Sequence, residues 1–140
     1  MDVNIKSNAK QVSKRIGKKG KELSESVKHA LLRTALEGKA IIQDRMTAGK
    51  AIKGGDFKPY NDAYAAFRRQ KGRSDRPDLK FSKLMFNSIT VKANSKQAEI
   101  FFTRATEAKK AAMNNKSRPF FGFSRKEENT LGKVFFKALK

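Results

Sequence analysis

The 140-residue chain contains no cysteine, no tryptophan, a single histidine and only 13 acidic residues. Without cysteine it can form no disulfide, no thiolate zinc site and no thiol nucleophile. None of its apolar runs approaches the ~20 residues of a membrane-spanning helix. The first ten residues, "MDVNIKSNAK", lack the apolar core of a signal peptide. We therefore expect a protein that is made in the cytoplasm and has no membrane partner.

The side chains that carry out catalysis are sparse and scattered. His29 follows Glu25 by one helical turn, a spacing that can orient an imidazole for general-base work, although a surface or interface histidine explains it more simply. Asp75 and Asp78 lie in an arginine-rich stretch, where ion pairing accounts for them. No spacing typical of metal ligands, and no Walker-A or Rossmann glycine pattern, occurs. We expect no enzyme, no cofactor and no metal site.

Basic residues, in contrast, are abundant. The 33 lysines and arginines give a formal net charge of +20, which favours an acidic partner or an assembly that spreads the charge. Nucleic acid is one such partner, because the basic clusters could neutralise phosphates and neighbouring aromatic rings could stack on bases. The candidate residues for an interface or for DNA contact are Lys14, Lys18, Lys19, Lys21, Arg68, Arg69, Arg73 and Arg76. Most phenylalanines, however, fall at alternating or helical positions that core packing explains.

Hydrophobic periodicity predicts an α+β fold. Apolar residues at helical spacing predict one long amphipathic helix over residues 11–46. Two alternating runs around the turn-forming Asn94 and Ser95 predict a β-hairpin over residues 88–103. An alanine-rich helix is expected over residues 106–113, and a C-terminal helix over 124–139. We expect the long N-terminal helix to pack on a small antiparallel sheet and the C-terminal helix to cover a neighbouring edge or face.

The chain is short enough for a single domain over residues 1–140. We expect a flexible basic segment over residues 1–20, where two glycines and several lysines weaken the helical pattern, and an extended loop region over 48–78. Within that region Asn61 or Asp62 can cap a short helix of two turns at most. The loops either reach adjacent subunits or are simply solvated.

The stretch "SRPFFGFSRKEE" is the densest aromatic patch in the chain. Pro119 suggests an edge strand, in which Phe120, Phe121 and Phe123 cannot all share one face because alternate residues point to opposite sides. One face would then meet the long helix and the other a neighbouring element or subunit. Arg118 is expected either to pair with an acid on the long helix or to contact another subunit.

Three short motifs occur in a characteristic order. They comprise Gly55, Phe57 and Pro59, then Leu79, Ser88 and Ile89, then Arg118, Pro119, Phe120, Gly122 and Ser124. Between and around them lie the long helix, the hairpin and a last helix that Ser124 and Glu127 can start as a capping box. This order resembles the tailed-bacteriophage virion morphogenesis families known as tail completion, neck or head-tail joining proteins.

The resemblance implies a noncatalytic building block of the virion at the head-tail junction. Similar proteins form rings, so a hexamer, or a dodecamer near a portal, is expected. The implied partners are further copies of the chain, portal or connector proteins, and tail tube or tail terminator proteins, with possible contact to DNA in the channel. The alternative that the residues leave open is a nonspecific nucleic-acid-binding basic protein.

Overall fold

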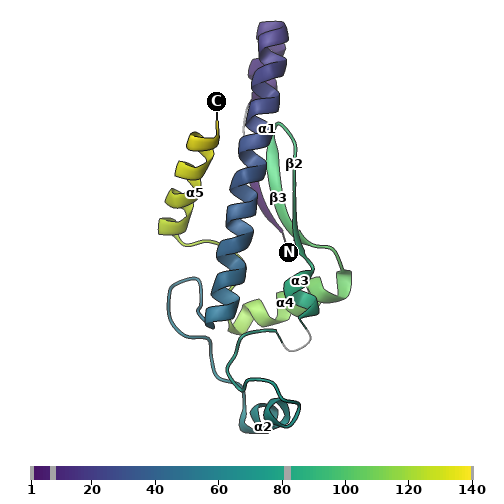
Figure 1. The fold of residues 1–140 in the computed structure, drawn as a ribbon, viewed down its shortest axis with the longest axis vertical. Helices are drawn as coiled ribbons and strands as arrows, with labels where there is room; N and C mark the ends of the chain where they lie inside the picture. Colours follow the sequence, from purple (N-terminus) through teal and green to yellow (C-terminus); the bar gives the residue numbers. More distant parts are fainter. Residues whose placement is uncertain (1, 7–8, 81–82, 140) are drawn as a thin grey trace.

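The computed structural model describes residues 2–6, 9–80 and 83–139, with side chains for 2–5, 20–80 and 83–139. A 40-residue helix, α1 (Ala9–Ala48), lies between the sheet and the last helix (Figure 1). Its buried residues recur every three or four positions from Val27 through Leu31 and Ala35 to Ile42 and Met46. The predicted long amphipathic helix is therefore confirmed, and it begins earlier than expected.

The sheet has three antiparallel strands in the order β1-β3-β2. The predicted hairpin is present as β2 (Ile89–Ala93) and β3 (Gln97–Phe102), joined by a turn in which the Asn94 side chain accepts hydrogen bonds from two backbone amides. Alternate residues of β3 are buried and contribute to the core, as a strand with one covered face requires.

The N-terminal strand β1 (Val3–Lys6) was not predicted. It pairs with β3, with Val3 opposite Ile100 and Ile5 opposite Ala98. Within the segment over residues 1–20 that was expected to be flexible, the structure has this strand and, from Ala9 onward, the first residues of α1. Val3 and Ile5 alternate with polar residues over four positions, the minimum for a strand pattern, and the strand forms through pairing with a distant one.

The C-terminal helix α5 (Arg125–Ala138) packs on α1, on the side away from the sheet (Figure 1). Leu131 is its buried residue, and Phe135 packs at the edge of the core. A glycine in α1 permits close contact with the segment that leads into α5. A Cβ atom at Gly38 would lie 2.8 Å from Phe123 Cζ and 3.0 Å from Ile100 Cδ1.

Residues 48–78 form a loop that is more ordered than expected. Lys50 and Asp56 form an isolated antiparallel bridge, and their side chains make an ion pair. A helix, α2 (Asp62–Gln70), follows with Asn61 as its cap. This helix is longer than the two turns predicted, because it continues through Arg68 to Gln70.

The two remaining helices are α3 (Leu84–Asn87) and α4 (Ala105–Ser117), which lie near the same end of the sheet (Figure 1). Helix α4 confirms the predicted alanine-rich helix but extends past its expected end at Asn114 and Asn115. The described chain therefore has the predicted α+β architecture, with α2 set apart at the end opposite the start of α1.

Candidate functional site

Two of the three motif segments contact each other directly, although about sixty residues separate them. Arg118 donates from Nε to the carbonyl oxygen of Lys58 at 2.7 Å and from Nη2 to that of Pro59 at 3.1 Å. The amide of Ile52 donates to the carbonyl oxygen of Pro119 at 2.9 Å. Arg118 thus holds the loop of the first motif in place. The expected ion pair between Arg118 and an acid on the long helix is not what the side chain makes.

The phenylalanines of the third motif enter the core of their own subunit. Phe120 is fully buried and Phe121 is 5% exposed, with their ring centroids 6.0 Å apart. Phe57 of the first motif is also buried, and Phe123 packs against the core near Gly38. The predicted edge strand is wrong, since residues 118–124 form no strand and neighbouring rings turn inward together.

The turn through the third motif depends on Asn115 and Gly122. Asn115 Oδ1 accepts hydrogen bonds from the amides of Phe120 at 2.9 Å and Phe121 at 3.0 Å. Gly122 has a φ of 157°, which side chains disfavour, and a Cβ there would lie 3.2 Å from Ile52 Cδ1. These contacts explain why a bent segment, and not an extended one, connects α4 to α5.

Arg45 joins the long helix to this segment and to α5. Its Nη1 donates to the carbonyl oxygens of Phe120 at 2.5 Å and Gly122 at 2.8 Å, and its Nη2 donates to Glu127. The Arg45 side chain is 5% exposed and that of Glu127 26%. The ion pair between the long helix and the third-motif region therefore uses Arg45, not Arg118.

Glu127 also completes the predicted capping box of α5, which is confirmed. Its carboxylate accepts from the amide of Ser124, whose hydroxyl accepts from the Glu127 amide. Burial would raise the pKa of Glu127, but the Ser124 amide and the Arg45 guanidinium together lower it below its ordinary value.

Arg68 anchors α2 to the loop that follows it. This residue is 1% exposed and donates to the carbonyl oxygen of Ser74 at 2.6 Å and to Asp78 Oδ1 at 2.9 Å. The proposed role of Arg68 as an interface or DNA-facing residue is therefore a wrong prediction for this conformation. Its charge is already paired inside the subunit.

Tyr60 lies between two guanidinium groups. The Cζ atoms of Arg68 and Arg118 lie 4.9 Å and 4.7 Å from its ring centroid. Burial raises the pKa of the Tyr60 hydroxyl, while Arg68 and a backbone hydrogen bond from Leu79 act in the opposite direction. Since Leu79 belongs to the second motif, Tyr60 connects all three motif segments.

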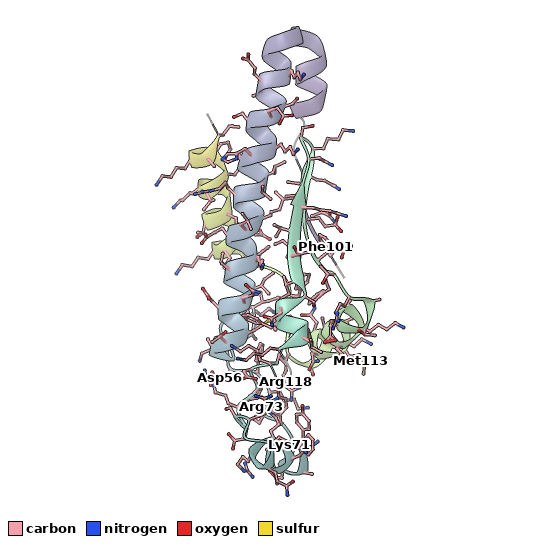
Figure 2. All side chains as sticks on the ribbon, turned by 45° about the vertical axis from the view of Figure 1, so that its right-hand side comes forward. Asp56, Lys71, Arg73, Phe101, Met113 and Arg118 are labelled. Carbon is pink, nitrogen blue, oxygen red and sulfur yellow. The ribbon has the colours of Figure 1, made fainter. Side chains whose placement is uncertain are left out.

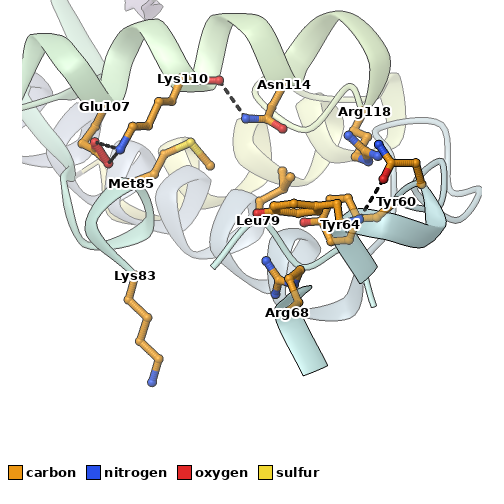
Figure 3. A pocket seen from close by; sticks show the side chains of 11 residues that line it. Tyr60, Tyr64, Arg68, Leu79, Lys83, Met85, Glu107, Lys110, Asn114 and Arg118 are labelled. Atoms are coloured by element: carbon orange, nitrogen blue, oxygen red, sulfur yellow. Dashed lines mark hydrogen bonds and ion pairs between the residues drawn. The ribbon is translucent and has the colours of Figure 1, made fainter. Parts of the chain in front are cut away.

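A cavity of about 470 Å³ opens beside this stack, and Figure 3 shows its lining. One wall carries Tyr60 and Tyr64, and the facing side carries Glu107, Lys110 and Asn114 of α4 (Figure 3). Glu107 is 2% exposed and accepts from the Lys110 ammonium at 3.1 Å. We call this the α2–α4 pocket.

The other motif residues have structural positions. Leu79, Ser88 and Ile89 are buried, and Ser88 Oγ donates to the carbonyl oxygen of Met85 at 2.9 Å. Gly55 is exposed and its carbonyl oxygen accepts from the amide of Ala51 at 2.7 Å, which closes the loop. The second motif therefore supports the sheet and the first supports the loop.

The remaining basic candidates differ in their surroundings. Arg69 pairs with Asp75 at 2.7 Å, and Arg76 donates to the carbonyl oxygen of Ala48. Lys21 and Arg73 are exposed, and Figure 2 labels Arg73 near α2. The side chains of three further candidates lie outside the described residues: Lys14, Lys18 and Lys19.

The groups considered for catalysis do not converge. Both His29 and Glu25 are exposed on α1, and Asp75 and Asp78 pair with Arg69 and Arg68. Within residues 2–6, 9–80 and 83–139, no three histidine or acidic side chains are grouped as metal ligands. In the same part of the chain, no helix has both the length and the apolarity that a membrane crossing requires.

Compared with known proteins, the chain matches no family model, no curated protein and no solved structure. The resemblance to phage morphogenesis proteins therefore depends on the order of the three motifs in the sequence.

Four residues of this region were missed in the sequence: Arg45, Tyr60, Glu107 and Asn115. A signal existed for Arg45, because it falls on the apolar stripe of α1 beside Met46. Tyr60 directly follows Pro59 of the first motif. Nothing local distinguishes Glu107 or Asn115 from other polar residues of an alanine-rich helix.

Proposed function

We propose that this chain is a noncatalytic structural component of a tailed-phage virion, forming a ring at the head-tail junction that joins the portal or connector to the tail. The observation that carries the proposal is the convergence of the three motif segments at one end of the molecule. Arg118 bonds the first segment, and Tyr60 contacts both Arg118 and the backbone of Leu79. Motif residues that a family retains in order are expected to have a common structural purpose of this kind.

The shape of the chain supports an assembly role. Helix α2 extends from the body on a loop, and Arg68 is its only buried residue (Figure 1). Nearby, Arg118 donates to two carbonyl oxygens of the supporting loop, and its guanidinium lies over the Tyr60 ring. A helix that projects from the body of the subunit, on a loop with internal hydrogen bonds, is well placed to contact a neighbouring subunit or ring.

The charge supports the same proposal. A monomer with a net charge of +20 repels itself, and partners with acidic surfaces or channel DNA would relieve that repulsion. In such an assembly the chain would reside in the virion after synthesis in the host cytoplasm. The ring would be a hexamer, or a dodecamer if it sits against a portal.

A nonspecific nucleic-acid-binding protein is the second candidate, favoured by exposed basic side chains such as Lys21, Arg69 and Arg73. Size-exclusion chromatography with light scattering, run with and without duplex DNA, separates the two. We expect self-association into a closed ring, or ordered assembly when a portal or tail protein is added. A stable monomer that binds duplex DNA tightly, with an affinity that falls steeply as salt rises, would refute the assembly proposal.

A further inference from the structure

Helix α2 leaves large parts of two aromatic side chains exposed. Tyr64 is 37% exposed and Phe67 is 42% exposed, and their rings stack with centroids 6.2 Å apart. Tyr60 continues this row, with its ring 4.8 Å from that of Tyr64. Aromatic rings gathered at the mouth of a cavity commonly mark a binding surface.

The α2–α4 pocket beside this row is large enough for one or two side chains of a partner. Its volume of about 470 Å³ falls within the ~300–1,000 Å³ typical of ligand sites. Leu79 and Met85 give it an apolar base, while Asn114 and Lys110 border it from α4 (Figure 3). An apolar or aromatic side chain would fit against this base.

The lining is positively charged. Arg68, Lys83, Lys110 and Arg118 contribute +4 and Glu107 contributes −1, which leaves +3. Arg68 is further neutralised by its pair with an aspartate outside the lining, which leaves +2. The site therefore attracts carboxylates.

Backbone strain is concentrated in the same lining. Leu79 and Lys83 have φ values of 59° and 62°, and they are the non-glycine residues with positive φ among those described. Such strained conformations are found most often at binding and active sites. The two residues flank the pocket from the segment between α2 and α3.

We propose that the α2–α4 pocket binds an acidic peptide segment of a partner protein, with an apolar or aromatic side chain inserted beside Tyr64 and carboxylates at Arg118 and Lys83. This inference rests on the proposed assembly function, for which it names the chemistry of one partner. A second copy of the chain is a poor occupant, because its own acids number only 13 and Glu127 is already paired.

Nucleic acid fits this pocket less well than a peptide does. A phosphate backbone requires a row of available cations, whereas Lys110 here neutralises Glu107 and Arg68 neutralises Asp78. Separate carboxylates at Arg118 and Lys83, with an apolar neighbour on the tyrosine row, need no continuous line of cations.

The test is selection of binders from a library of short random peptides, followed by fluorescence anisotropy with the synthesised consensus peptide. We expect a consensus with aspartate or glutamate beside an aromatic or aliphatic residue. Tyr64→Ala should weaken binding about tenfold or more, and Lys83→Gln should weaken it less. Both side chains are exposed, so neither change should unfold the protein.

Matched controls lie on α5. Phe136→Ala removes an aromatic ring that is 73% exposed, and Lys133→Gln removes an exposed lysine. Both should bind the peptide as the unchanged protein does.

Three results would overturn the proposal: a consensus without acidic residues, equal losses in the pocket and control variants, or displacement of the peptide by single-stranded oligonucleotide with the same loss at Tyr64→Ala. Ring formation by the unchanged protein together with any of these would leave the assembly function standing and remove only this pocket from it.

Discussion

Replacing Arg45 with methionine tests whether α1 and the third-motif segment are held together by this one side chain. The substitution keeps an unbranched side chain in the buried site but removes the donors to the carbonyl oxygens of Phe120 and Gly122 and to the Glu127 carboxylate. Each carbonyl left without a donor costs about 1 kcal/mol or more. The carboxylate is 26% exposed, so water replaces part of the lost pairing, and its loss adds about 1 kcal/mol.

The free energy of unfolding should therefore fall by about 3 kcal/mol, at the lower end of the range for breaking a buried ion pair. Because the chain has no tryptophan, urea unfolding followed by far-UV circular dichroism is the suitable assay. The matched control is Arg69→Met, which breaks an ion pair whose side chains are 57% and 53% exposed and should cost less than about 1 kcal/mol. Equal losses in the two variants would refute the reasoning.

Three further changes test the packing and the third-motif turn. Gly38→Ala should destabilise the protein by about 1–2 kcal/mol, because the new methyl group would lie 2.8 Å from the Phe123 ring. The control Gly132→Ala has open space around it and should stabilise the protein by up to about 1 kcal/mol. Stabilisation by both changes would contradict the close contact at Gly38. Asn115→Ala should lower the free energy of unfolding by about 1–3 kcal/mol, because the amides of Phe120 and Phe121 lose their acceptor. Asn115→Asp keeps an acceptor oxygen and should recover most of that loss. Equal urea midpoints for the two variants would argue against the amide contacts. For Glu127, a folded-state pKa below the ordinary 4.5 means that its ionised form stabilises the fold above that pH. The stability difference between the unchanged protein and Glu127→Gln should therefore shrink as the pH falls below 4.5, and a pH-independent difference in urea unfolding would be the contrary result.

The elements that were predicted well are those with a local signal. The apolar stripe of α1 repeats over many turns, the hairpin has two alternating runs around Asn94 and Ser95, and α5 begins with the Ser124 and Glu127 pair. In each case the residues that specify the structure lie within a few positions of one another.

The elements that were missed depend on distant partners. Strand β1 is four residues long and exists through its pairing with β3. The third motif bends because Asn115 and Arg45 bind its backbone. Asn115 has no local signal, and the place of Arg45 on the apolar stripe of α1 does not reveal its distant partners. Arg68 was grouped with its exposed neighbours although burial sets it apart.

Residue order and composition alone are enough to specify the α+β class, the long helix, the hairpin, the cap of α5 and the strongly basic character of the chain. These follow from periodicity, turn residues and composition, which act locally or over the whole chain. Three features appear only once the chain is folded: Arg118 binds the loop of the first motif, Tyr60 lies between two guanidinium groups, and a cationic pocket opens beside α2. Those contacts join residues far apart in the chain, and their geometry depends on how the packed elements place each backbone.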